Sequence, residues 1–351
     1  KIAEKLAAKT GAYAFVHPFG CSQLGDDQEL TQKILRGLVN HPNAAGVLVL
    51  GLGCENNNIE LFKTVLGEYD PQRVRFMNCQ DENDEIAAGV KIIEELKAYA
   101  DQFKPQPVPV SKLRVGLKCG GSDGFSGITA NPLVGLFSDW LIAQGGTTIL
   151  TEVPEMFGAE GLLMDRCVTQ EVFGKAVAMI NGFKDYFIRH NEVVYDNPSP
   201  GNKEGGITTL EDKSCGCVQK GGSAPIMDVI GYGDAVTTKG LNMLYGPGND
   251  LVSSTALTAA GAHMVLFTTG RGTPFGAPVP TIKIATNTSL ATKKAGWMDF
   301  NAGVVADGDR TLEETGADLM ALVLEVASGK QTKTEARGFR EISIFKDGVV
   351  L

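Results

Sequence analysis

The stretch from Lys118 to Pro132 constrains the fold most, because it joins a strand pattern to a helix pattern through an unusual loop. The apolar run Leu113–Leu117 leads into it, and apolar residues at helical spacing follow it over 133–143. The loop itself holds four glycines with thiol, carboxylate, hydroxyl and amide side chains. Glycine permits tight turns and close approach to a ligand. Such loops at strand ends are where α/β proteins place their chemistry.

The rest of the chain repeats this alternation of strands and helices. In the first part we predict strands at 13–16, 45–50 and 73–77, and helices at 28–38 and 86–99. Later strands are predicted at 147–151, 226–230, 240–245, 264–268, 281–285 and 342–345, with long helices at 169–190 and 313–327. Alternating strands and helices imply parallel sheets with right-handed crossovers. We therefore predict an α/β protein with two Rossmann-like parallel-sheet domains, helices covering both faces, the second larger and more elaborate.

A proline-rich segment separates these two parts. In Lys104-Pro-Gln-Pro-Val-Pro109 the alternating prolines favour extended backbone. The length of 351 residues suits two or three domains. We predict one domain over 1–103, a linker over 104–110 and a second domain over 111–351.

Composition excludes several classes of function. The net charge of -9 argues against nucleic-acid binding, which needs a basic face. No apolar run reaches the roughly 18–20 residues that span a bilayer, and the sequence has no signal-peptide pattern. Seven cysteines without tight disulfide spacing favour free thiols in a reducing cytoplasm.

Four Gly-x-Gly pairs invite a nucleotide-binding interpretation, but none completes the dinucleotide fingerprint. That fingerprint needs a third glycine three residues after the second. The residues found there are Asn56, Val236, Leu251 and Phe275. The Walker pattern is also absent from the sequence. A nicotinamide-dependent oxidoreductase is therefore disfavoured.

Four blocks of the sequence resemble the galactarate/altronate dehydratase family. They are Lys118–Pro132, Asn197–Lys203 followed by Gly205-Gly206, Phe267–Gly276, and Asp299–Gly303. Three further segments, Ser122–Phe125, Gly182–Tyr186 and Thr209–Lys213, are more similar to the altronate branch than to the galactarate branch. The resemblance spreads over most of the chain.

The resemblance implies an iron(II)-dependent hydro-lyase. Its substrate would be D-altronate, which loses water across C2 and C3 to give 2-dehydro-3-deoxy-D-gluconate. Family members also carry a small N-terminal β-rich domain, and nothing in this chain matches it. We expect that domain in cis or as a separate subunit, and a homo-oligomer as the assembly.

Cysteines in glycine-rich loops suggest where a metal would bind. Cys21, Cys54 and Cys119 each follow a predicted strand, and Cys79 is placed similarly. Because thiolates bind iron and carboxylates fill remaining positions, we predict an Fe²⁺ site, with Mn²⁺ as an alternative metal. Its predicted ligands are Cys21, Cys54, Cys119, Glu55 and Glu152. An iron-sulfur cluster held by three cysteines is a further alternative. In another alternative the cysteines bind no metal and are only small apolar residues near a sheet edge.

The remaining polar residues of these blocks give the predicted catalytic groups. We expect Asp123, Lys203, His17 and Arg271 to be catalytic. Lys203 or His17 would take the C2 proton, and Arg271 or Lys283 would hold the substrate carboxylate. Two alternatives remain open. His17 can be only a hydrogen-bonded loop residue, and Glu152 and Glu155 can be only a solvated pair. The predicted substrate-binding residues are Ser122, Asn131, Asn202, Asp250, Thr268, Lys283 and Asn301.

Two alternative functions follow from the same residues. The substrate would be galactarate or another 2,3-dihydroxy sugar acid if the hydroxyl contacts differ, because sequence does not resolve stereochemistry. The second alternative function is a subunit that only binds a sugar acid and needs a separate N-terminal domain for turnover. Asp123 and Lys203 are the residues whose replacement by alanine tests the catalytic interpretation.

Overall fold

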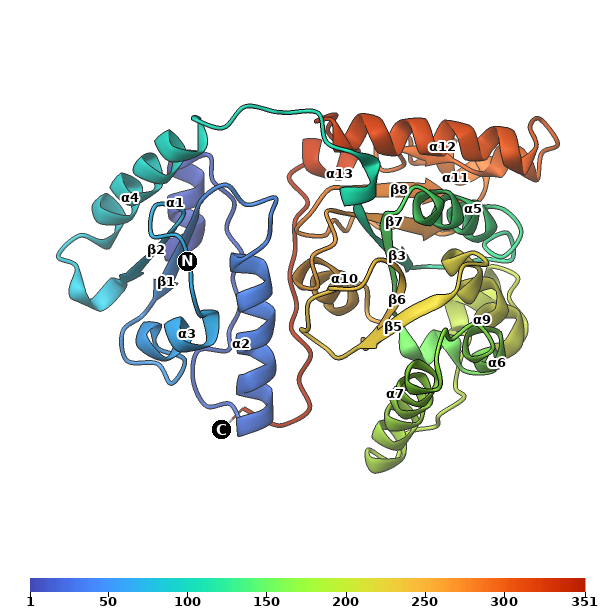
Figure 1. The fold of residues 1–351 in the computed structure, drawn as a ribbon, viewed down its shortest axis with the longest axis horizontal. Helices are drawn as coiled ribbons and strands as arrows, with labels where there is room; N and C mark the ends of the chain where they lie inside the picture. The colour runs from blue at the N-terminus through green and yellow to red at the C-terminus, as the bar shows by residue number, and fades with distance from the viewer. Residues whose placement is uncertain (351) are drawn as a thin grey trace. The chain divides into compact units, whose positions relative to one another are not determined.

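The computed structural model describes residues 1–350, which form two compact units (Figure 1). Unit 1 is Lys1–Val108 together with the chain from Ile342, and unit 2 is Pro109–Glu341. The boundary at residues 108 and 109 falls within the proline-rich segment. Among the described helices, none is long and apolar enough to cross a membrane.

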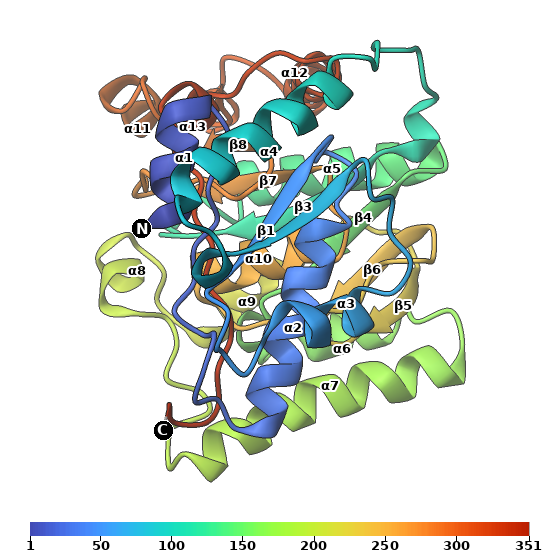
Figure 2. The ribbon, with the colours of Figure 1, turned by 90° about the vertical axis from the view of Figure 1, so that its left-hand side faces the viewer.

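Unit 1 contains a small parallel sheet with helices around it. Strands β1 (Val47–Gly51) and β2 (Val74–Asn78) lie side by side in Figures 1 and 2, with Val47 paired to Val74. Its helices are α1 (Ile2–Thr10), α2 (Gly25–Val39), α3 (Ile59–Leu66) and α4 (Glu85–Ala100). Val39, Phe62, Leu66 and Val74 form one buried cluster of its core. Apolar residues of α2, α3 and β2 thus hold this unit together.

Two predicted strands are wrong, and both fall in unit 1. Residues 13–16 are irregular, with Tyr13 and Val16 exposed by 59% and 45%. Residues 342–345 are also irregular, and by their contacts they are part of unit 1. The residues that follow are held in unit 1 by Asp27 of α2, whose carboxylate pairs with Lys346 at 2.7 Å and accepts from the next two backbone N–H groups.

Unit 2 is built on a seven-stranded parallel sheet of order β5-β6-β4-β3-β7-β8-β9. The strands are β3 (Arg114–Cys119), β4 (Thr147–Leu150), β5 (Ile226–Ile230), β6 (Gly240–Leu244), β7 (Met264–Thr269), β8 (Thr281–Ala285) and β9 (Phe300–Asn301). The central strands β3 and β7 are buried along their length apart from half-buried Arg114, as expected for parallel strands covered on both faces. The predicted α/β class is confirmed.

Helices cover both faces of this sheet, as predicted. The helices of unit 2 are α5 (Ala130–Ala143), α6 (Glu160–Met164), α7 (Gln170–Arg189), α8 (Pro200–Glu204), α9 (Leu210–Val218), α10 (Asp250–Ala259), α11 (Thr288–Lys293), α12 (Leu312–Ala327) and α13 (Lys333–Ala336). Gly116 of β3 lies against Leu257 of α10. Val115 and Leu117, which alternate with it, join the core that includes α5. Figure 1 shows α10 and α5 on opposite sides of the strands, and Figure 2 shows the length of α7.

Strand β3 is the point at which the order of strands reverses. The chain runs from β3 to β4 on one side and later returns to β7 on the other. Open parallel sheets bind their ligands at the carboxyl ends of strands beside such a point. The loop after β3 is the glycine-rich stretch singled out above, so the fold places it at the expected ligand edge.

The close contact of α5 with residues after α9 gives a testable prediction for stability. A Cβ atom at Gly135 would lie 2.3 Å from the Gln219 carbonyl oxygen, which is backbone and has little freedom to move. We expect Gly135→Ala to lower the free energy of unfolding by about 1–3 kcal/mol, as overpacking does. Gly182 of α7 is the matched control, since nothing lies within 4 Å of its Cβ position. Gly182→Ala should raise the free energy of unfolding by about 0.5–1 kcal/mol. Urea unfolding measures both, and equal effects would contradict the packing argument.

Candidate active site

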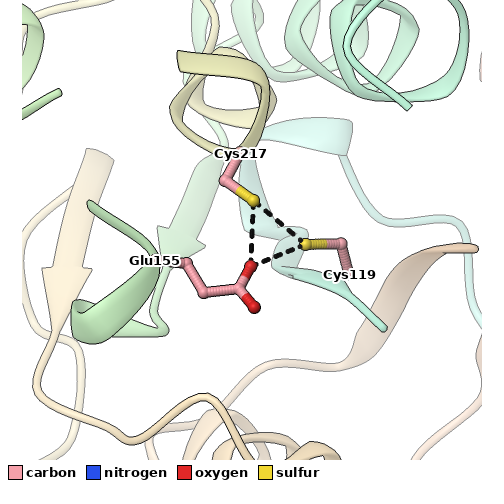
Figure 3. Close-up of side chains that lie close together, drawn as sticks. All are labelled: Cys119, Glu155 and Cys217. Atoms are coloured by element: carbon pink, nitrogen blue, oxygen red, sulfur yellow. Dashed lines mark hydrogen bonds between the residues drawn. The ribbon is translucent and has the colours of Figure 1, made fainter. Parts of the chain in front are cut away.

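Three side chains from separate parts of unit 2 meet beyond the carboxyl ends of β3 and β4. They are Cys119, Glu155 and Cys217, here called the thiol–carboxylate cluster (Figure 3). The Cys217 thiol donates to Glu155 Oε2 at 2.9 Å, and the Cys119 thiol contacts the same oxygen at 3.2 Å. The two sulfur atoms are 3.5 Å apart. Among the described residues, this is the group of three that could hold a metal ion.

Local structure explains how these three residues come together. Cys119 ends β3, and Glu155 lies in the 3-10 turn Val153–Met156 that follows β4. Cys217 lies on α9, which begins at the Thr209 cap. A Cβ atom on Gly216 would approach Gly127 Cα to 3.3 Å, so the helix lies directly against the glycine-rich loop. Glycine at both positions permits this approach.

Lysine ammonium groups surround the cluster. Lys220 donates to Cys119 Sγ at 2.8 Å and pairs with Glu152 Oε2 at 3.3 Å. Lys118 pairs with the other oxygen of Glu152 and, at 2.9 Å, with Asp250. These lysines and Glu152 are at most 1% exposed. Buried charges of this kind persist only when they are paired.

These charges shift the pKa values of the groups that they contact. Burial alone raises the pKa of Glu155, but the charges of Lys213 and Lys220 outweigh it and lower that pKa to about 2. Burial lowers the pKa of Lys118, but Glu152 and Asp250 outweigh it and hold that pKa above its ordinary value. The hydrogen bond with Cys119, together with burial, raises the pKa of the Cys217 thiol. At neutral pH we therefore expect a carboxylate at Glu155 and a protonated Cys217.

The formal charges around the cluster balance when both thiols are protonated. The carboxylates of Glu152, Glu155 and Asp250 oppose the ammonium groups of Lys118, Lys213 and Lys220. Exchanging two thiol protons for one divalent cation would leave the total charge unchanged. The neighbourhood is therefore electrostatically suited to a divalent metal on two thiolates and one carboxylate.

A second group of contacts brings three of the sequence blocks together; we call it the glycine-loop junction. Asn202 Nδ2 donates to the Ser122 carbonyl at 2.9 Å, and Gly124 N–H donates to the Gly205 carbonyl at 2.8 Å. The Gly121 carbonyl accepts from two N–H groups of the loop after β7, those of residues 270 and 271. The blocks starting at residues 118, 197 and 267 thus share one junction.

Lys213 joins the junction to the thiol–carboxylate cluster. Its Nζ pairs with Glu155 Oε1 at 3.0 Å and donates to Asn197 Oδ1 and Asn202 Oδ1 at 2.9 and 3.1 Å. Asn202 also forms the capping box of α8 with Ser199. The Lys213 ammonium therefore holds the segment 197–206 against Glu155, one of the three candidate metal ligands. This side chain is 9% exposed and Glu155 is 13% exposed, so the cluster reaches the surface here.

Asp123 is held inside the junction by hydrogen bonds. Its Oδ1 accepts from Ser126 at 3.1 Å and from Thr286 at 2.9 Å, and Oδ2 accepts from Asn287 at 3.0 Å. The side chain connects the glycine-rich loop to the end of β8. This arrangement gives Asp123 a positioning role in the structure, beside the catalytic role predicted from the sequence.

The other residues predicted in unit 2 occupy different surroundings. Thr268 donates to Asn131 at 2.7 Å inside the core, and Asn301 donates to Thr288 at 3.0 Å near β9. Exposed Arg271 pairs with Glu204 at 3.2 Å, next to exposed Lys203. Arg271 and Lys203 thus border the junction on its solvent side. Lys283 lies buried on the face of the Phe267 ring, 3.7 Å from its centroid.

The residues predicted in unit 1 lie in loops of that unit. Burial lowers the pKa of His17, whose Nδ1 accepts from the Phe19 N–H at 3.1 Å. Glu55 accepts from the Leu52 and Gly53 N–H groups at 2.7 and 2.6 Å. Cys21 and Cys54 are exposed. Within the described part of unit 1, these residues form no group of three ligands.

Sequence reasoning missed four residues of the site. These are Cys217 and the lysines Lys118, Lys213 and Lys220. One signal was available, because the family-like segment Thr209–Lys213 runs directly into Cys215-Gly-Cys217. Glu152, predicted as a metal ligand, lies beside the cluster but outside the group of three.

Comparison with known proteins identifies the family. The model for "D-galactarate/Altronate dehydratase, C-terminal" matches residues 110–350, and that for "D-galactarate dehydratase/Altronate hydrolase, second domain" matches residues 1–101. The chain belongs to the D-galactarate/altronate dehydratase family. It is 55% identical to altronate dehydratase of Escherichia coli, over 97% of this chain and 69% of that protein. It is 57% identical to altronate dehydratase of Bacillus subtilis, over 95% and 67%.

A more distant relative has a different substrate in its name. Galactarate dehydratase (L-threo-forming) of Escherichia coli is 38% identical over 83% of this chain and 58% of that protein. Identity is therefore higher to the two altronate dehydratases than to this galactarate dehydratase, in agreement with the branch indicated by the sequence blocks. The family consists of sugar-acid dehydratases, so the chain is a hydro-lyase.

Proposed function

We propose that this protein dehydrates D-altronate to 2-dehydro-3-deoxy-D-gluconate. The observation that carries the proposal is the junction of three glycine-rich blocks beside the thiol–carboxylate cluster, with Lys213 bound to both. The names of the two relatives at 55% and 57% identity support the choice of substrate. A polyol acid presents one carboxylate and several hydroxyls, which the charged and amide side chains of this region match in kind.

The reaction sets clear requirements for the chain. The C2 proton next to a carboxylate is weakly acidic, so the enediolate that forms needs positive charge close by. Arg271 is placed on the solvent side of the junction, where its guanidinium can hold the carboxylate in bidentate fashion. Of the two bases predicted from the sequence, Lys203 borders the junction within unit 2 and is the proposed proton acceptor. A positioned base contributes roughly 10²–10⁴-fold.

The thiol–carboxylate cluster fits the iron(II) that the family resemblance implies. Two thiols and a carboxylate oxygen lie within 4.8 Å of one another, and soft thiolates favour iron over manganese, which prefers oxygen ligands. Cys119, Glu155 and Cys217 would hold the ion, which when bound supplies Lewis-acid stabilisation of negative charge. The group holds two cysteines among the described residues, one fewer than a three-cysteine iron-sulfur cluster requires.

Iron affinity tests the assigned ligands. We expect Cys217→Ala and Glu155→Ala to weaken Fe²⁺ binding by more than the roughly 10- to 100-fold that loss of an outer-shell partner costs. Anaerobic titration followed by metal analysis measures the affinity. Cys215→Ser is the matched control, because this cysteine lies on the same helix outside the cluster, and it should bind iron as the parent protein does.

Turnover of a panel of hexonates and hexarates tests the reaction itself. With Fe²⁺ under anaerobic conditions, D-altronate should be the best substrate, and Lys203→Ala or Arg271→Ala should reduce the rate. Preference for galactarate would favour the second candidate, which the 38% identical relative motivates. If the protein binds altronate without turnover, and turnover appears when a small β-rich domain is added, the result would favour the alternative of a sugar-acid-binding subunit.

The cysteines also bear on the place of action. All seven are free in the structure, and three of them, Cys21, Cys54 and Cys79, lie in unit 1. We propose that the protein works in a reducing cytoplasm, where such thiols persist.

A further inference from the structure

We propose that Cys119 and Cys217 form a reversible disulfide when the protein meets a peroxide, so that the thiol–carboxylate cluster is a redox modification site. The consequence for iron rests on the function proposed above, but the disulfide itself does not. Their sulfur atoms are already in contact at 3.5 Å. A disulfide needs about 2.05 Å, so the two sulfur atoms must approach each other by roughly 1.5 Å.

The surroundings supply both acid-base partners that the reaction needs. Lys220 donates a hydrogen bond to Cys119 Sγ at 2.8 Å, so a proton donor lies against this sulfur and beside the oxygen that it would carry as a sulfenic acid. Glu155 Oε2 accepts from the Cys217 thiol at 2.9 Å, so a carboxylate is in place to take its proton. Cys119 is therefore the sulfur that reacts first, and Cys217 is the resolving sulfur.

The proposed reaction balances with hydrogen peroxide as the oxidant. Cys119 sulfur attacks one peroxide oxygen, the O–O bond breaks, and the thiol proton leaves with the departing hydroxide as water. This gives a sulfenic acid at Cys119. Cys217 sulfur then attacks that sulfur, the S–O bond breaks, and the Cys217 proton passes through Glu155 to the second hydroxide as water. Two thiols are oxidised, and one peroxide is reduced to two waters.

Access to the cluster selects the oxidant. Cys119 and Cys217 are 1% and 4% exposed, and Glu155 beside them is 13% exposed. The space beside Glu155 and Cys217 has no room for a water-sized molecule, so a peroxide enters only when the Glu155 side chain, the most exposed of the three, moves aside. A bulky disulfide such as oxidised glutathione needs a much larger opening. The exposed Cys21 and Cys54 show the opposite pattern, because they are accessible to both.

Bond formation between these two sulfurs would remove two of the three proposed metal donors. The disulfide carries no thiolate, and Glu155 alone is a weak site for iron. Loss of iron and of turnover would then follow oxidation, and a dithiol reductant would restore both. The metal and the disulfide are alternatives at one place.

Mass spectrometry tests the disulfide without reference to activity. The metal-free protein is treated with hydrogen peroxide, its remaining thiols are blocked, and it is digested without reduction. We expect a peptide pair joining Cys119 to Cys217, lighter by two hydrogens than the separate peptides and released by dithiothreitol. Cys215→Ser should give the same pair. In Cys217→Ser the reaction should stop at the Cys119 sulfenic acid, which dimedone captures.

Three results would overturn the proposal. They are a stable sulfenic acid at Cys119 in the parent protein, a cross-link from Cys119 to Lys220 that retains an oxygen atom, and pairing of either cysteine with Cys21 or Cys54 instead. Iron binding by the oxidised protein separates the two proposals. If the Cys119–Cys217 pair forms and iron still binds as before, the metal assignment fails while the disulfide stands.

Discussion

Glu152→Ala is expected to destabilise unit 2 by about 3–5 kcal/mol, the cost of removing one partner from a buried ion pair. Its carboxylate pairs with Lys118 and Lys220, and it also accepts from the Cys119 N–H at 3.1 Å. Without it, two ammonium groups that are at most 1% exposed lose a common counter-charge. Both tryptophans, Trp140 and Trp297, lie in unit 2, so fluorescence during urea unfolding reports on this unit.

An exposed ion pair provides the matched control. Lys330 and Glu325 are joined at 2.6 Å, with side chains 55% and 57% exposed. Exposed pairs contribute about 0–1 kcal/mol, so Glu325→Ala should change the unfolding free energy within that range. A loss at Glu152 no larger than the loss at Glu325 would show that the buried lysines find other partners or lose their protons at little cost.

Much of the fold of unit 2 was predictable from hydrophobic pattern alone. The predicted strands at 226–230 and 281–285 coincide with β5 and β8. Strand β8 lies inside the sheet and is fully buried, as its pattern predicts, whereas β5 lies at the edge of the sheet and is mostly half-buried. The same reasoning failed at 13–16 and 342–345. A short apolar alternation becomes a strand only where a neighbouring strand offers hydrogen bonds, and sequence does not say whether one is there.

The site was predictable only where the sequence was unusual. Glycine-rich context marked Cys119 and Asp123, since ordinary connectors do not need such loops. The sequence contained no signal that Lys118 and Lys220 are buried, because a buried lysine looks the same in a sequence as an exposed one. Their burial depends on Glu152, which the chain brings to them from β4. Charge pairing between distant segments is therefore what single-sequence reasoning missed here.

Lys283→Met is expected to raise stability below neutral pH, with a gain that shrinks as pH rises. Burial lowers the pKa of Lys283 from 10.5 to about 7, against the weaker opposing charge of Asp250. At about 1.36 kcal/mol per unit, that shift corresponds to roughly 5 kcal/mol spent on burying an ammonium. Contact with the Phe267 ring recovers about 1–2 kcal/mol. Methionine fills similar space without charge, so the variant should be more stable by roughly 3 kcal/mol at pH 6.

The sign of the pH dependence follows from proton binding. Below pH 7 Lys283 is protonated in the folded and unfolded states, and the full cost applies. Between about 7 and 10.5 the folded state releases its proton while the unfolded state keeps it, so the stability of the parent protein rises with pH. The advantage of Lys283→Met should therefore fall by roughly 1.4 kcal/mol per pH unit above 7. Lys283→Arg is the control, because a guanidinium stays charged and should show no such recovery. A constant difference between the parent and Lys283→Met from pH 6 to pH 9 would mean that the buried amine keeps its proton in the folded state over this whole range, and would contradict the lowered pKa.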